Sequence, residues 1–179
     1  MDKWYGPAGL LAIARLCLEG LVVTVPMENT NTLEAIKDSL RNRPGYLLRR
    51  CLQDSSKAFE SACSDVGITQ RQYDYLYVLG QVRVVTQGDL SKLLDIDRST
   101  NTLVIGILQK KGLIERWAHP TDTRKKCVRL TALGQQTLDV TRPRAAIAAD
   151  NMLAALTELE AKQLLAALNK IVDQASQTA

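Results

Sequence analysis

Residues 86–131, TQGDLSKLLDIDRSTNTLVIGILQKKGLIERWAHPTDTRKKCVRLT, contain the pattern that decides the fold. Two short helical segments come first, one opening after Thr86 and one opening after Asp97 and ending at Gly112. Threonine and aspartate are preferred at helix N-caps, and glycine commonly follows a last helical turn. Because residues 95–97 leave room only for a tight turn, the sequence predicts a helix-turn-helix.

After Gly112 the apolar residues change from helical to alternating spacing. Residues 113–117 are predicted to form a strand, residues 119–122 a turn and residues 126–130 the returning strand, which together give a β-hairpin. A hairpin directly after a helix-turn-helix is the wing of a winged helix.

The positive charge of the chain is concentrated in the same region. Residues 98–129 contain eight basic and two acidic side chains, a local net charge of +6, whereas the 179-residue chain as a whole carries +4. The remaining residues therefore carry −2. A localised basic surface of this kind favours a nucleic-acid partner.

The flanking segments are helical, so the predicted fold is mainly α with a small β-hairpin wing. Thr69 with Gln72, and Thr157 with Glu160, form capping boxes, while a helix capped by Thr131 is expected to be disturbed at Pro143. The apolar faces of the terminal helices need a partner, which favours a homodimer. We expect an N-terminal extension at 1–31, dimerisation helices at 32–66 and 135–179, and a winged helix-turn-helix lobe at 67–134.

Three runs carry a family resemblance: LSKLLDIDRST (90–100), LQKKGLIER (108–116) and HPTDTRKKCVRLTALG (119–134). Together they resemble the MarR family of winged-helix transcriptional regulators, over roughly residues 40–175. The run RPGYLLRR (43–50) looks like the branch that includes regulators of aromatic-acid catabolism. The resemblance implies a homodimer on a pseudo-palindromic duplex DNA operator, acting as a repressor in the cytoplasm. It also implies a small anionic or phenolic effector, bound between the dimer region and the DNA-binding lobe.

The predicted recognition helix has one face suited to a major groove. A helical wheel places Thr100, Asn101, Val104, Ile107 and Leu108 on the buried side, and polar side chains opposite. Arginine bonds the O6 and N7 of guanine, while serine and threonine reach bases or phosphates. The candidate DNA contacts are Arg98, Ser99, Thr100, Asn101, Thr102, Gln109 and Lys110 from the helix, and Asp122, Arg124, Lys125 and Lys126 from the wing.

Two departures from the family pattern bear on these contacts. The wing tip usually reads Asp-Arg-Arg, whereas here it reads Asp122-Thr123-Arg124. Leu103 and Ile107 stand where family members often carry polar or basic residues, which shifts the expected sequence preference.

Candidate effector contacts come from arginine and tyrosine side chains that can pair a carboxylate and stack on its ring. They are Tyr46, Arg49, Arg50, Tyr73 and Tyr77. The alternative is that one or two of the tyrosines at 73, 75 and 77 belong to the core and that the arginines are solvated.

No cofactor, metal site or enzymatic activity is expected. The chain has one histidine, no C-x-x-C pair and no phosphate loop or nucleophile motif. Two alternatives stay open: a regulator that senses oxidants through Cys51 or Cys63, and a winged helix that binds proteins instead of DNA. Inert packing is the favoured role of the two cysteines.

The N-terminal residues 8–26 are mostly apolar, but Arg15 and Glu19 interrupt the run. This pattern favours an amphipathic helix over a membrane span or a secretory signal. Met27 is an alternative natural start, in which case residues 1–26 carry no functional weight.

Overall fold

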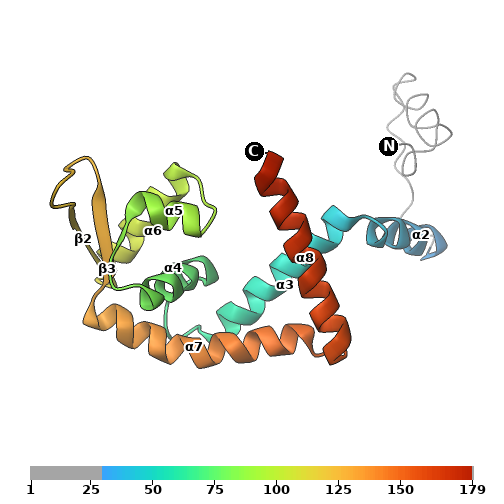
Figure 1. Ribbon diagram of the computed structural model, residues 1–179. Helices are drawn as coiled ribbons and strands as arrows, with labels where there is room; N and C mark the ends of the chain where they lie inside the picture. Colours follow the sequence, from blue (N-terminus) through green and yellow to red (C-terminus); the bar gives the residue numbers. More distant parts are fainter. Residues whose placement is uncertain (1–29, 179) are drawn as a thin grey trace, which may run out of the picture. The chain divides into compact units, whose positions relative to one another are not determined.

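The computed structural model describes residues 30–178, so the helix expected at residues 8–26 lies outside the described part. The chain divides into two compact units, residues 1–47 and 48–179. The first contains α2 (Thr30–Arg41) and the start of α3 (Pro44–Ala62). The second contains the rest of α3, α4 (Gln70–Gln81), β1 (Val85–Thr86), α5 (Gln87–Leu93), α6 (Arg98–Lys110), β2 (Ile114–Ala118), β3 (Lys126–Leu130), α7 (Ala132–Leu153) and α8 (Glu158–Thr178) (Figure 1).

The predicted hairpin is confirmed, and a third strand extends it. The strands form an antiparallel sheet in the order β1-β3-β2, with Trp117 opposite Cys127 in the hairpin. β1 contributes only two residues, Val85 and Thr86, which pair with Val128 and Cys127. β1 therefore ties the chain just before α5 to the middle of β3.

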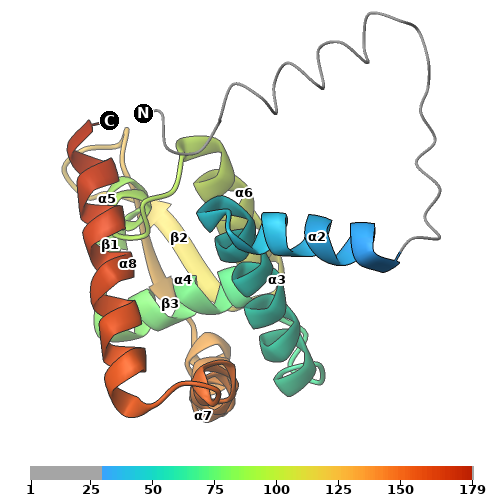
Figure 2. The same cartoon turned by 90° about the vertical axis from the view of Figure 1, so that its right-hand side faces the viewer.

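The core of the second unit lies where α4, α5, α6 and α7 meet the sheet. Figure 2 looks along α7, and α4 packs against both α7 and β3. Large side chains from each element are fully buried, including Leu76, Leu90, Ile105, Val128 and Leu138. The helix-turn-helix and the wing are thus held on one core, which fixes α6 relative to the hairpin.

Most of the predicted helix caps are present. The side chains of Thr86, Thr131 and Asp97 accept hydrogen bonds from backbone N–H groups in the first turns of α5, α7 and α6. Thr157 and Glu160 form the reciprocal capping box ahead of α8. Short-range sequence signals therefore set where these helices begin.

Two local expectations need correction. Thr69 accepts a hydrogen bond from the backbone N–H of Gln72, but the Gln72 side chain accepts one from Lys111 Nζ instead of bonding back to Thr69. Pro143 does not interrupt α7, which is continuous from Ala132 to Leu153. The acceptor that a proline leaves unpaired is the carbonyl four residues earlier, here that of the exposed residue Asp139.

Two long helices keep apolar side chains at the surface. In α3, Phe59 is buried, whereas Leu48 and Leu52 are exposed. In α8 the expected apolar face is present, and Leu159, Leu165 and Ile171 are all more than half exposed. Among residues 30–178, no helix has the length and apolar character needed to cross a membrane.

Candidate nucleic-acid interface

The start of α6 is fixed by Asp97. Its Oδ1 accepts hydrogen bonds from the backbone N–H groups of Ser99 and Thr100, at 2.9 and 3.0 Å. The preceding turn contains Asp95 with a φ of 49°, a left-handed conformation that aspartate tolerates better than most residues. Hydrogen bonds from Ser99 and Thr100 hold the pKa of Asp97 well below its usual range, so the cap stays ionised throughout the physiological pH range.

Asn101 anchors the buried side of α6 and does not face solvent. Its side-chain N–H₂ donates to the Gln87 carbonyl at 2.8 Å, and its Oδ1 accepts from the Tyr75 hydroxyl at 3.0 Å. Asn101 is 2% exposed. Its selection as a DNA contact is therefore wrong: the same side chain that could bond a base is used to join α6 to α4 and α5.

For the other residues of α6, the burial predicted from the helical wheel agrees closely with the burial in the structure. Val104 and Leu108 are buried as expected, Thr100 and Ile107 are half-buried, and Ile105 is buried although the wheel did not select it. Six exposed residues make up the outward side of α6, which we call the reading face: Arg98, Ser99, Thr102, Leu103, Gln109 and Lys110.

Two hydroxyls of the reading face are engaged within the protein. Ser99 Oγ donates to Asp97, while Thr102 Oγ1 donates to the Arg98 carbonyl at 2.8 Å and accepts from Gln87 Nε2 at 3.2 Å. The side chains of Arg98, Gln109 and Lys110, at the two ends of the helix, have no such bond with any described residue. The hydrogen-bonding groups available to a ligand therefore lie at the ends of α6.

The wing presents a basic tip held by Asp122. Its Oδ1 accepts from the backbone N–H of Arg124 at 3.2 Å and from Arg124 Nε at 3.1 Å. The Arg124 side chain is nevertheless 90% exposed, and Lys125 and Lys126 are exposed beside it. Asp122 thus positions Arg124, while the cations face outward.

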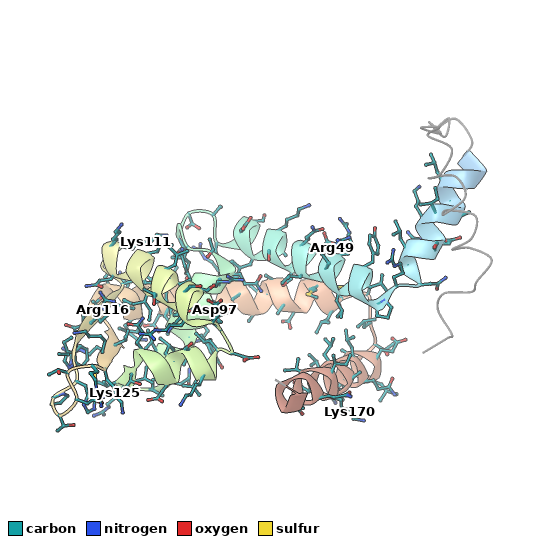
Figure 3. The ribbon with its side chains drawn as sticks, turned by 90° about the horizontal axis from the view of Figure 1, so that it is seen from above. Arg49, Asp97, Lys111, Arg116, Lys125 and Lys170 are labelled. Carbon is teal, nitrogen blue, oxygen red and sulfur yellow. The ribbon has the colours of Figure 1, made fainter. Side chains whose placement is uncertain are left out.

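Three residues of the region have structural roles. Lys111 Nζ donates to the Gly67 carbonyl and to Gln72 at 2.9 Å, away from the wing (Figure 3). Arg129 pairs with Glu115 and lies over the Trp117 ring. His119 Nδ1 accepts a hydrogen bond from the Thr121 backbone N–H at 3.4 Å, within the turn of the hairpin. The cations available for an anionic partner are thus fewer than the local charge suggests.

Within the second unit, the predicted effector residues of α3 lie apart from those of α4. Tyr73 is half-buried on α4, with its ring centroid 5.5 Å from that of Phe59 and 6.1 Å from that of Tyr77. Arg49 and Arg50 lie nine or ten residues before Phe59 in α3, about 14 Å along the helix axis. Arg50 pairs with Asp54 at 3.4 Å. Tyr46 belongs to the first unit and is half-buried, and Tyr75 is a core residue.

Arg142 of α7 is a cation near Tyr73, and it was not among the predicted effector residues. Burial raises the pKa of Tyr73, and the nearby Arg142 guanidinium opposes that rise. A Cβ added at Gly80, on the last turn of α4, would be 3.7 Å from an Arg142 guanidinium nitrogen. Arg142 forms no hydrogen bond or ion pair with residues 30–178. The sequence places Arg142 on the helix predicted after Thr131, but no local pattern there relates it to the tyrosines.

The cysteines differ in environment. Cys63 is 1% exposed and burial raises the pKa of its thiol, which disfavours the reactive thiolate. Cys127 is also buried, whereas Cys51 is exposed, so its predicted packing role is wrong. The helical stripe that contains Cys51 is uncovered at this end of α3.

An exposed helix face capped at its N-terminus, a basic hairpin beside it and one shared core define a winged helix-turn-helix DNA-binding protein. The match to the MarR family model covers residues 68–126, from just before α4 to the first residue of β3. The chain belongs to the MarR family, and is a DNA-binding transcriptional regulator.

Known transcriptional regulators are similar to this chain in sequence and in structure. The putative transcriptional regulatory protein for the hcr operon of Thauera aromatica is 28% identical over 84% of this chain and 91% of its own length. A cysteine variant of Escherichia coli MarR bound to operator DNA is 25% identical, covering 71% of this chain and 91% of that one, with a TM-score of 0.67. BpsR of Bordetella bronchiseptica, whose DNA binding is regulated by 6-hydroxynicotinic acid, is 27% identical over 74% and 94%, with a TM-score of 0.70.

Proposed function

We propose that the protein is a transcriptional repressor that binds pseudo-palindromic duplex DNA as a homodimer and is released by a small aromatic carboxylic acid. The observation that carries the effector class is the position of Arg142, a cation without a counter-ion in the described chain, near Tyr73 and the last turn of α4. The Tyr73 ring lies 6.1 Å from that of Tyr77. An arginine pairs a carboxylate in a fork, and a tyrosine ring packs against an aromatic ring. Regulation of the relative BpsR by an aromatic acid supports the same chemistry.

The proposed site replaces Arg49 and Arg50 with Arg142 as the carboxylate partner. Tyr73, Tyr77 and Arg142 come from α4 and α7, which pack against each other in the second unit. α4 also carries Tyr75, whose hydroxyl bonds Asn101 of α6. A ligand on one side of α4 therefore lies one helix away from the reading face, which gives a short physical route from effector to DNA.

Aromatic acids are expected to weaken operator binding, whereas their amides are not. Benzoate, cinnamate and 6-hydroxynicotinate carry the charge that Arg142 needs, and the matching amides keep the ring but lose the charge. Losing one charge-assisted hydrogen-bonded pair costs about 1.5–3 kcal/mol, so Arg142→Gln should raise the half-effective acid concentration at least about tenfold. Fluorescence anisotropy of a labelled operator duplex measures this release.

The matched control is Arg50→Gln, which removes a guanidinium that already pairs with Asp54. It should leave the acid response unchanged. Equal loss of response in both variants would argue against the Arg142 site, and release by a thiol oxidant with no response to any acid would favour a redox regulator. Operator binding without acid should persist in Arg142→Gln, because Arg142 lies outside α6 and the wing.

The homodimer is expected to use α8. Light scattering should give about twice the chain mass of 19.8 kDa. Leu165, 51% exposed on α8, is apolar surface that a partner helix can cover, so Leu165→Glu should shift the protein toward the monomer. Leu133→Glu, at a similarly exposed leucine of α7, is the control. A wild-type monomer at micromolar concentration would contradict the proposal.

A further inference from the structure

The middle turn of α6 presents an apolar side chain to solvent. Leu103 is 64% exposed, whereas the other large apolar side chains of α6 are buried or half-buried. Leu103 thus does little for the packing of the described chain. It lies one turn after Ser99 and two turns before Lys110, within the reading face.

The neighbours of Leu103 add no free hydrogen-bonding group to this turn. The Thr102 hydroxyl is engaged by the Arg98 carbonyl and by Gln87. Gly106 has no side chain, and a Cβ built there would meet nothing within 4 Å. The centre of the reading face is therefore apolar, and no side chain projects from it at Gly106. Arg98 and Lys110 supply charge at its ends.

The major groove of DNA offers one apolar feature, the C5-methyl group of thymine. Cytosine presents only a C–H group at the equivalent position, and the other distinguishing groups are hydrogen-bond donors or acceptors that a leucine side chain cannot satisfy. The open space at Gly106 lets the backbone approach the base edges closely enough for a leucine to reach them. The surrounding cations Arg98 and Lys110 fit DNA better than an apolar protein surface.

We propose that Leu103 is a specificity-determining residue that selects thymine in the centre of each half-site by contact with its C5-methyl group. The inference rests on α6 entering the major groove, as the proposed function requires. It adds that part of the operator sequence is selected by apolar contact at the middle of the helix, between polar contacts at its ends.

The test uses full-length protein and an operator selected by the protein from random-sequence duplexes. Each thymine is replaced in turn by deoxyuridine, which removes only the methyl group, in both half-sites at one fixed salt concentration. Burying one methyl is worth about fourfold in affinity, so one thymine position should show about a fifteenfold loss across the two half-sites. Every other thymine should show little change.

Leu103→Ala should abolish the difference between thymine and deoxyuridine at that position, and Leu103→Met, which keeps an apolar side chain of similar reach, should retain it. Leu133→Ala removes a similarly exposed leucine outside α6 and the wing, and should keep the full wild-type dependence. Leu103 is exposed, so each variant should melt within a few degrees of the wild type, which circular dichroism checks.

Tight binding without any methyl-dependent position would overturn the inference and leave the proposed function intact. The same holds for a methyl dependence that persists in Leu103→Ala, because another residue would then make the contact. Failure of the wild-type protein to bind any duplex is a different result, and would overturn the proposed function together with the inference.

Discussion

Raising the salt concentration from about 50 to 200 mM is expected to weaken operator binding by about four orders of magnitude. Each subunit of the proposed dimer places about four cations on phosphates, drawn from α6 and from the wing residues Arg124, Lys125 and Lys126. Release of counterions from about eight phosphates gives a slope of log K against log salt of roughly −7. Anisotropy titrations at five salt concentrations measure this slope.

Single charge removals test which cations make these contacts. Arg124→Ala should make the slope shallower by about 2, one phosphate for each subunit. Lys111→Gln should leave the slope unchanged, because Lys111 bonds Gly67 and Gln72 instead of facing the wing surface. A wild-type slope shallower than about −2 would rule out the surface formed by α6 and the wing.

Replacing Gly134 by alanine is expected to destabilise the fold more than any other glycine substitution in the described chain. A Cβ at Gly134 would lie 1.9 Å from the Leu113 carbonyl oxygen and 2.9 Å from its carbon. That carbonyl cannot move freely, since it accepts a hydrogen bond from the Thr131 backbone N–H. Overpacking against backbone costs about 3 kcal/mol, which lowers the melting temperature of a chain this size by about 6 to 12 °C.

Gly106→Ala is the matched control, because it is the same change in a helix with open space around the new methyl group. Alanine is favoured over glycine in a helix interior, so this variant should gain about 0.5–1 kcal/mol. Thermal melts followed by circular dichroism compare the two variants with the wild type. A Gly134→Ala melt within 2 °C of the wild type would show that α7 can shift away from the sheet.

Features set by neighbouring residues could be predicted from the sequence. Thr86, Asp97 and Thr131 cap the helices that their positions indicated, because an N-cap bond spans only two or three residues. The two hairpin strands followed from alternation and a turn. β1 was not predicted, since two residues carry no periodicity and the strand exists only by pairing with Val128 and Cys127.

Features that depend on distant residues could not be predicted. Asn101 looked like a base contact because its partner Tyr75 lies 26 residues away, and nothing in the local pattern indicates that bond. Lys111 added to the local charge, but its partners Gly67 and Gln72 precede it by about forty residues. The proposed effector cation was sought near residue 50, whereas α7 brings Arg142 near Tyr73.

The hydrogen bonds of Asn101 have a consequence for retargeting the protein to new operators. They fix the orientation of α6 about its own axis from its buried side, opposite the reading face. The Asp97 cap fixes the residue at which the helix begins. The side chains at the outward positions 103, 106 and 109 take no part in the hydrogen bonds of Asn101 or of Asp97. A combinatorial library restricted to those three positions would therefore vary the recognised sequence on a constant scaffold, and most of its members should fold.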